Sequence, residues 1–77
     1  MINKEEFLEG LRNQFEESDA LNLSFDTVFK ELDTWDSLTR FSIVSFVEDD
    51  YQVILKVEGL QNMATPSDLY EYINSNT

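Results

Sequence analysis

The chain contains no cysteine and no histidine among its 77 residues. These two absences exclude disulfide bonds, zinc sites built on Cys or His, and any Cys nucleophile or His base. The missing cysteines also fit a cytoplasmic protein, which is the location we expect. The N-terminal residues lack the apolar segment of a signal peptide. No run approaches the roughly 18 apolar residues of a membrane span, so we expect no membrane insertion.

Glycine and proline are also scarce, with two and one respectively, whereas 42% of the residues are hydrophobic. That composition is too apolar and too regular for a disordered tail. A chain this short buries only a modest fraction of its unfolded surface, so we expect one marginally stable domain over residues 1–77. Such a domain leaves little room for a deep catalytic cleft, which argues against an enzyme.

Basic residues are few. The chain has five Lys and Arg and sixteen Asp and Glu, so the formal net charge is −11. Nucleic acid is not an expected partner, since phosphate binding needs clustered Lys and Arg. Self-repulsion favours a soluble monomer, and charge complementarity makes basic protein surfaces the natural partners. The acidic clusters lack the spacing and the central glycine of an EF-hand, so we expect no metal site.

Hydrophobic spacing predicts a first helix that Asn3 caps and that ends near residues 18–19. Its expected buried face consists of apolar residues at helical spacing, namely Phe7, Leu8, Leu11 and Phe15. Residues 19–36 then form a long ordered connection, with too many apolar residues for a solvated linker and a short helical turn within residues 26–32. A loop of this length in so small a domain is often functional.

A second helix is predicted from about Ser37 to Asp50, with Asp36 or Ser37 as its cap. Seven apolar residues form its expected buried face, five in one stripe and two beside it: Leu38, Phe41, Val44, Val47 and Tyr51, with Ile43 and Phe46. The width of this face indicates burial on more than one side. Residues 52–57 are expected to be an extended link, because no second strand is available to pair with them.

The clearest local signal for a helix comes near the C-terminus, after a short helical turn expected over residues 59–63. Thr65 can cap a last helix, Pro66 suits its first position, and Asp68 can complete a capping box. The prediction is therefore an all-α fold: a small antiparallel four-helix bundle, with three main helices, one short helix and a long first loop.

Ser37 begins the second helix, where an irregular acidic stretch gives way to apolar residues. From the local pattern alone, Ser or Asp before a helix is most often a cap. A serine nucleophile is disfavoured because the chain has no histidine and no GxSxG motif. A phosphodiester on Ser37, however, would lie at a helix N-terminus, where free N–H groups and the macrodipole favour an anion. The preceding Trp35 is expected to pack on Thr39 or Phe41.

The tetrapeptide Trp35-Asp36-Ser37-Leu38 resembles the attachment motif of the acyl carrier protein family. The likeness continues along nearly the whole chain, through segments 26–32, 47–51 and 65–73. Asp-Ser-Leu alone is a weak signal, but together with the length, the acidity and the helix layout it becomes fairly specific. The resemblance implies a helical carrier protein that is not catalytic.

In this family a separate phosphopantetheinyl transferase moves 4′-phosphopantetheine from coenzyme A onto the serine that corresponds to Ser37. The thiol of this covalent cofactor carries acyl or aminoacyl groups as thioesters to biosynthetic enzymes. The resemblance also implies that Asp36 assists the transfer by helping to hold the metal. Fatty acid, polyketide, nonribosomal peptide and envelope sugar pathways all stay open.

The docking surface expected for the acyl-loading and acyl-using enzymes lies along the second helix, on Leu38, Arg40, Glu48 and Asp49 beside Asp36. Leu38 would be a partly exposed apolar anchor within an acidic rim. Arg40 departs from the acidic residues that family members often carry there, which suggests dedicated partners. Phe41 and Phe46 are bulkier than usual, and we hypothesise that they reduce the cavity between helices. The cargo would then be short or polar, or would stay outside the bundle.

The alternative from another class is an acidic interaction protein, or a nucleic-acid mimic, that occupies a basic protein surface without modification. In that case Ser37 would only cap a helix. An enzyme ranks third, because no acid–base pair with an accompanying pocket is visible in the sequence.

Overall fold

The computed structural model describes residues 2–33 and 35–77, so residue 34 of the expected first connection lies outside it. Within these residues the chain forms five α-helices and one 3-10 helix, and no strand. They are α1 (Lys4–Arg12), α2 (Glu17–Asn22), η1 (Phe29–Glu31), α3 (Ser37–Tyr51), α4 (Val57–Gln61) and α5 (Pro66–Ser75). The predicted all-α fold is confirmed, with α1, α3 and α5 as its main helices.

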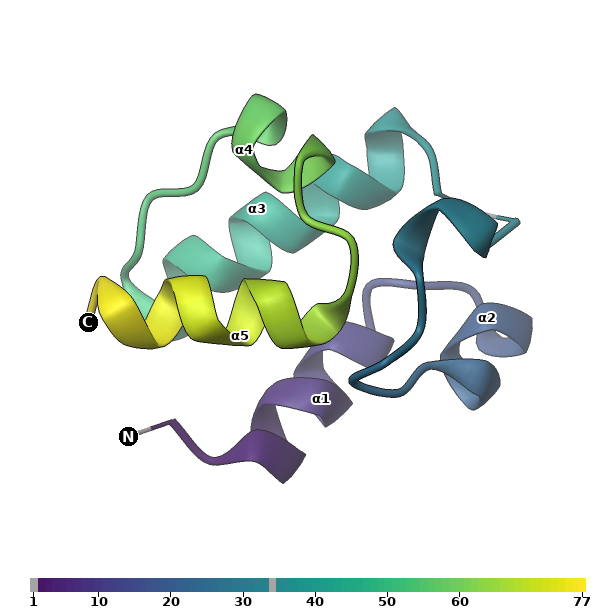
Figure 1. The fold of residues 1–77 in the computed structure, drawn as a ribbon, viewed down its shortest axis with the longest axis horizontal. Coiled ribbons are helices and arrows are strands. Elements are labelled where there is room, and N and C mark those ends of the chain that lie inside the picture. Colours follow the sequence, from purple (N-terminus) through teal and green to yellow (C-terminus); the bar gives the residue numbers. More distant parts are fainter. Residues whose placement is uncertain (1, 34) are drawn as a thin grey trace.

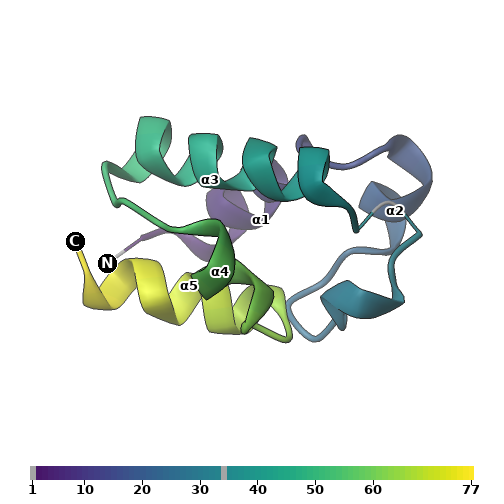
Figure 2. The same ribbon diagram turned by 90° about the horizontal axis from the view of Figure 1, so that it is seen from above.

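The helices pack around one core in a body of 30 × 25 × 19 Å. Helix α1 contacts both α3 and α5, and the short α4 packs on α3 (Figures 1 and 2). The two chain ends lie on the same side of the molecule (Figure 1). They are joined there because the Ile2 N–H donates to Asn74 Oδ1 at 3.2 Å and the Tyr70 hydroxyl donates to the Ile2 carbonyl oxygen.

Aromatic rings form the centre of the core, and Phe7 lies among them with no exposed surface. The Phe7 ring centroid is 5.4 Å from that of Tyr70 and 6.1 to 6.2 Å from those of three further rings, on Phe25, Phe46 and Tyr51. These residues come from α1, the first loop, α3 and α5. The packing of a single side chain therefore connects the main helices to one another.

Helix α1 begins at the predicted cap, where Asn3 Oδ1 accepts a hydrogen bond from the Glu6 N–H at 3.0 Å. The helix nevertheless ends at Arg12, well before the expected end. The Arg12 guanidinium donates to the Leu23 carbonyl oxygen from Nε at 3.2 Å and from Nη2 at 2.7 Å, and Phe15 is buried in the core. These contacts turn the chain back at this point, so the remaining expected helix becomes a turn followed by the separate helix α2.

The described residues of the long first loop, 19–33 and 35–36, are ordered, as predicted, and the short helical turn among them is η1. Backbone hydrogen bonds fix it to the start of α5, from the Phe29 N–H to the Ala64 carbonyl oxygen at 2.8 Å and from the Ser67 N–H to that of Phe25 at 3.2 Å. The Leu23 and Phe29 side chains of the loop are buried, although others such as Leu21 point to solvent. The loop is thus a packed part of the fold that leads into α3.

Helix α3 ends at Tyr51 and is capped by Gln52, which has a φ of 58° and a ψ of 34° and is the only non-glycine residue with positive φ in residues 2–33 and 35–77. Its N–H donates to the Glu48 carbonyl oxygen at 2.9 Å. The extended link predicted over residues 52–57 is confirmed for residues 53–56, where Val53 and Leu55 are buried while Ile54 between them is exposed, whereas Gln52 is left-handed and Val57 begins α4. The left-handed turn at Gln52 thus reverses the chain toward α4.

Gln52→Gly is expected to raise the free energy of unfolding by up to about 1 kcal/mol, because glycine adopts positive φ without strain. Urea denaturation measures the change. Gln61→Gly at the end of α4, where φ is not positive, is the matched control and is expected to destabilise the protein. A lower midpoint for Gln52→Gly would contradict the argument.

The last helix follows its sequence signal closely. The Thr65 hydroxyl accepts from the Asp68 N–H at 3.4 Å, and Asp68 Oδ2 accepts from the Thr65 N–H at 3.4 Å and from the Ala64 N–H at 2.9 Å. Pro66 occupies the first turn. The capping box is therefore confirmed, and the short helix predicted over residues 59–63 is found two residues earlier, as α4.

Candidate functional site

Ser37 is the first residue of the 15-residue helix α3 and is exposed. Of the two predicted caps, Asp36 is the one that the structure uses. Its extended backbone, with φ of −128° and ψ of −178°, precedes the helix, and its Oδ1 accepts a hydrogen bond from the Thr39 N–H at 2.9 Å. Because Asp36 supplies the cap, the Ser37 hydroxyl is left on the surface at the helix N-terminus.

Hydrogen bonds to the carboxylate keep the pKa of Asp36 below its ordinary value of 3.8. The largest contribution comes from the Thr39 backbone N–H, and desolvation opposes it; the Thr39 hydroxyl, the Leu38 N–H and the Arg40 charge lower the pKa further. Asp36 is therefore an anion at neutral pH, one residue before the Ser37 hydroxyl.

Asp36→Asn is expected to reduce the loss of stability on acidification. The lowered pKa of Asp36 makes its contribution present above the unfolded-state pKa and lost as pH falls through the folded-state value. Asparagine still caps a helix, so the substitution tests the charge. Urea midpoints at about pH 6 and about pH 2.5 measure the difference, with Asp26→Asn in the first loop as the charge control. An unchanged pH dependence for Asp36→Asn would show that the cap charge does not stabilise the fold.

The Trp35 ring anchors the segment that precedes Ser37. It stacks on Phe29 of η1, with the ring centroids 4.4 Å apart and the planes inclined by 6°, and it lies 6.3 Å from the Phe15 ring. The ring stacking is thus with the first loop, whereas Phe41, one of the two partners expected from the sequence, points to solvent with 61% of its surface exposed. Stacked rings fix the entry into α3 and with it the position of Ser37.

Arg40 lies one helical turn after Ser37 and is half-buried. Its guanidinium carbon is 5.6 Å from the centre of the Trp35 ring, and its Nη2 donates to Ser37 Oγ at 3.4 Å. Arg40 Nε is buried and has no hydrogen-bond partner among residues 2–33 and 35–77. This inward orientation could not be predicted from the sequence, because it depends on where the first loop places Trp35.

The exposed face of α3 differs from the one that periodicity indicated. The buried residues are Thr39, Ile43, Phe46 and Val47. Leu38 and Phe41, both in the predicted buried stripe, are 79% and 61% exposed, so that part of the prediction is wrong. Leu38 is nevertheless exposed in the way that an apolar docking anchor requires, and its exposure exceeds the partial exposure expected from the sequence.

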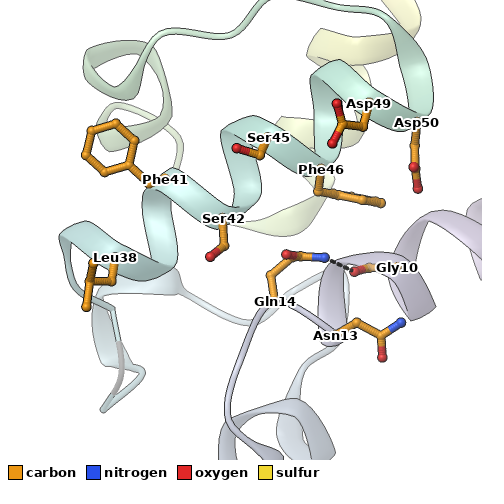
Figure 3. Close-up of a pocket in the computed structure, with 10 residues that line it drawn as sticks. All are labelled: Gly10, Asn13, Gln14, Leu38, Phe41, Ser42, Ser45, Phe46, Asp49 and Asp50. Carbon is orange, nitrogen blue, oxygen red and sulfur yellow. Dashed lines mark hydrogen bonds between the residues drawn. The ribbon is translucent and has the colours of Figure 1, made fainter.

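An open groove of about 560 Å³ runs between the end of α1 and the exposed face of α3 (Figure 3). Its lining residues are Gly10, Asn13, Gln14, Leu38, Phe41, Ser42, Ser45, Phe46, Asp49 and Asp50. Leu38 and Phe41 lie at one end and the two aspartates at the other, and the Gln14 amide donates to the Gly10 carbonyl oxygen on the α1 side (Figure 3). The groove was not predicted, because it exists only where α1 ends early.

Phe46 forms part of the wall of this groove and packs closely against α1 at Gly10. A Cβ atom at Gly10 would lie 2.6 Å from Phe46 Cε1, so the ring occupies the place that any other residue at position 10 would need. Phe46 is 7% exposed and also contacts the Phe7 and Tyr51 rings, at 6.2 and 5.6 Å. Its bulk therefore fills the interface between these two helices.

The residues predicted as functional occupy two separate places. Asp36, Ser37 and Arg40 meet at the N-terminus of α3, whereas Glu48 and Asp49 are exposed in its last turns. Ten residues separate Leu38 from Glu48, a distance of about 15 Å along the helix. A partner must therefore cover most of the length of α3 to contact both places.

Among residues 2–33 and 35–77, no group of three or more Asp and Glu side chains is arranged to hold a metal ion. In the same residues, no helix has both the length and the apolar composition required to cross a membrane.

Comparisons with known proteins identify the family. The chain is 39% identical over 59 residues to the acyl carrier protein of Onion yellows phytoplasma (strain OY-M), which covers 77% of this chain and 78% of that protein. It is 37% identical over 54 residues to the acyl carrier proteins of Lactococcus lactis subsp. cremoris (strain MG1363) and subsp. lactis (strain IL1403), covering 70% of each chain. No family model matches the chain, and no solved structure matches it. The chain therefore belongs to the acyl carrier protein family, and it is a carrier protein and not an enzyme.

Proposed function

We propose that the chain carries acyl or aminoacyl cargo as a thioester on a 4′-phosphopantetheine arm attached to Ser37. The observation that carries this proposal is the exposed Ser37 hydroxyl at the first position of α3, beside a cap supplied by Asp36. The positive end of the helix macrodipole favours the phosphodiester that attachment creates. Arg40, whose Nη2 contacts this hydroxyl, is a further feature that fits an anion, because its Nε is buried and has no hydrogen-bond partner among the residues that the structure describes.

Attachment is a group transfer from coenzyme A by a separate transferase. A bond forms between Ser37 Oγ and the phosphorus that bears the pantetheine, the pyrophosphate bond of coenzyme A breaks, and adenosine 3′,5′-bisphosphate leaves. The hydroxyl proton passes to a base of the transferase. Asp36, an exposed anion one residue before the acceptor, is proposed to help hold the metal in that complex. The attached arm supplies a thiol, and a chain without cysteine offers no competing one.

The proposed docking surface extends along α3 and consists of Leu38, Arg40, Glu48 and Asp49. Leu38 is the apolar contact, because 79% of its surface is exposed. The last turn of α3 contains acidic residues and no basic one, although a helix C-terminus disfavours negative charge. A basic surface on the transferase, or on a loading or acyl-using enzyme, would relieve this repulsion and would be attracted over a distance.

The cargo is proposed to be short or polar, or to stay outside the bundle. Phe46 fills the space between α1 and α3 against Gly10, which supports this part of the proposal. Phe41 does not contribute in the expected way, because its side chain is exposed. Nuclear Overhauser contacts between a medium-chain acyl group on Ser37 and core residues such as Ile43 would contradict it.

Intact mass spectrometry tests the proposed function. The purified chain is incubated with coenzyme A, magnesium and a broad-specificity phosphopantetheinyl transferase, and a single addition of phosphopantetheine is expected. An acidic interaction protein that works without modification would keep its mass. Omission of coenzyme A from an otherwise identical reaction is the control.

A further inference from the structure

The guanidinium of Arg40 lies next to Ser37 and has hydrogen-bond donors along one edge that are only partly satisfied. The N–H groups of Nε and Nη2 point from the same edge of an arginine, the edge that binds phosphate through two parallel hydrogen bonds. In this structure Nη2 donates to Ser37 Oγ at 3.4 Å, which is a long hydrogen bond, and Nε is buried with no partner among the described residues. A buried donor without a partner destabilises the chain as it stands.

We infer that Arg40 binds the phosphodiester of the arm on Ser37 through Nη2 and Nε, and so orients the root of the arm on α3. This inference rests on the proposed function, because it needs the modified serine. The phosphorus would be bonded to Oγ, so its free oxygens would lie one bond beyond the atom that Nη2 already contacts. Binding would replace the long hydrogen bond from Nη2 to Ser37 Oγ with a shorter one to a phosphodiester oxygen. It would also give the buried Nε an acceptor.

Two features hold the guanidinium in place for this role. The Trp35 ring lies under it, with 5.6 Å between the guanidinium carbon and the ring centre, and that ring is itself stacked on Phe29. A cation–π contact uses the face of the guanidinium and leaves its edge N–H groups free of the ring, so the phosphodiester has to displace only the atoms that cover Nε. Arg40 is therefore oriented before modification, which limits the conformational entropy lost when it binds the phosphodiester.

The charge of the chain gives the contact a further consequence. Modification adds a negative charge to a protein whose formal net charge is already −11. Arg40 is the one basic residue within α3, and the first turn of that helix contains no acidic residue. It therefore offsets the added repulsion locally, and the effect should weaken as salt screens the charges.

Nitrogen-15 NMR of the arginine Nε–H groups tests the inference directly. The chain has two arginines, and Arg12, whose Nε and Nη2 already donate to the Leu23 carbonyl oxygen, is an internal reference. On conversion to the modified form, the Arg40 Nε–H signal is expected to shift downfield and to exchange more slowly with water, while that of Arg12 stays in place. The Arg40→Gln variant lacks the Arg40 Nε–H group, so the signal that is missing from its spectrum is the one that belongs to Arg40.

Thermal unfolding of unmodified and modified forms gives a second readout. In Arg40→Gln, the change in Tm caused by modification is expected to be lower than in the wild type by about 4 °C, and the gap should shrink in high salt. Arg40→Lys keeps the charge without the two-donor edge and should restore part of the gap. Lys56→Gln, which removes an exposed charge from the link after α3, is the matched control and should behave as wild type.

The outcomes separate this inference from the function on which it rests. If the mass increases but the Arg40 Nε–H signal and the Tm difference match those of the controls, the role of Arg40 is wrong and the carrier function stands. If the mass does not increase, both are wrong. If the signal shifts and Arg40→Gln removes the Tm difference, Arg40 binds the phosphodiester.

Discussion

Phe7→Ala is expected to lower the free energy of unfolding by about 3–5 kcal/mol, the usual cost of removing a fully buried aromatic ring. At about 0.05–0.15 kcal/mol per residue, a chain of 77 residues has a total stability of about 4–12 kcal/mol. The substitution therefore removes a large part of the stability. Phe7 has no exposed surface and contacts rings from three other parts of the chain, so no neighbour can fill the space without disturbing another.

Circular dichroism during heating measures this effect, and a fall in Tm of about 20 °C is expected. Phe41→Ala provides the matched control, because it removes the same ring from a side chain that is 61% exposed and should change Tm little. Equal effects of the two substitutions would show that the core is not organised around Phe7.

Ser37→Ala is expected to abolish phosphopantetheine transfer altogether, because it removes the oxygen that bonds to phosphorus. The fold should survive, since the cap hydrogen bond comes from Asp36 and Ser37 is exposed. Intact mass after incubation with coenzyme A and the transferase measures the effect, and circular dichroism confirms the helices. The expected difference is complete modification of the wild type against none of the variant.

Ser45→Ala is the control for that experiment. Ser45 is an exposed serine on the same helix and lines the groove, but it lies about two turns from the N-terminus. It should be modified like the wild type. Modification of a folded Ser37→Ala chain would show that another hydroxyl is the acceptor.

The elements with strong local signals were predictable from the sequence. The Thr65 and Asp68 capping box specified the start of α5, and Asp36 specified that of α3, because side chains within four residues satisfy the free N–H groups. The early end of α1 was not predictable, since it depends on the Arg12 contact with Leu23, eleven residues away. Helix α2 was missed because the residue before it, Glu16, is not one of the residue types that favour the cap position. Its side chain accordingly makes no capping hydrogen bond.

The burial of α3 shows a different limit. Its apolar residues occur almost all round the helix, so spacing alone did not determine which side faces the core. Contacts with α1 and α4 decide this, and they bury Ile43 and Val47 while leaving Leu38 and Phe41 exposed. The exposed pair forms one end of the groove, a surface that periodicity assigned to the interior.

The candidate site was also predictable only in part. The Asp36-Ser37-Leu38 segment and the acidic end of α3 could be recognised from the sequence. The contact of Arg40 with Ser37 and its position over Trp35 were not, because Trp35 is placed by stacking on Phe29 in the first loop. The sequence thus indicated which residues could react or bind, but not which side chains surround them in the fold.

The proposed carrier function depends on Ser37 as the point of covalent attachment, and peptide fragmentation of the modified wild-type chain tests this most directly. After incubation with coenzyme A, magnesium and transferase, we predict one phosphopantetheine group, located by tandem mass spectrometry on Ser37 and on no other residue. An unmodified chain, or a group located on a different side chain, would contradict the account.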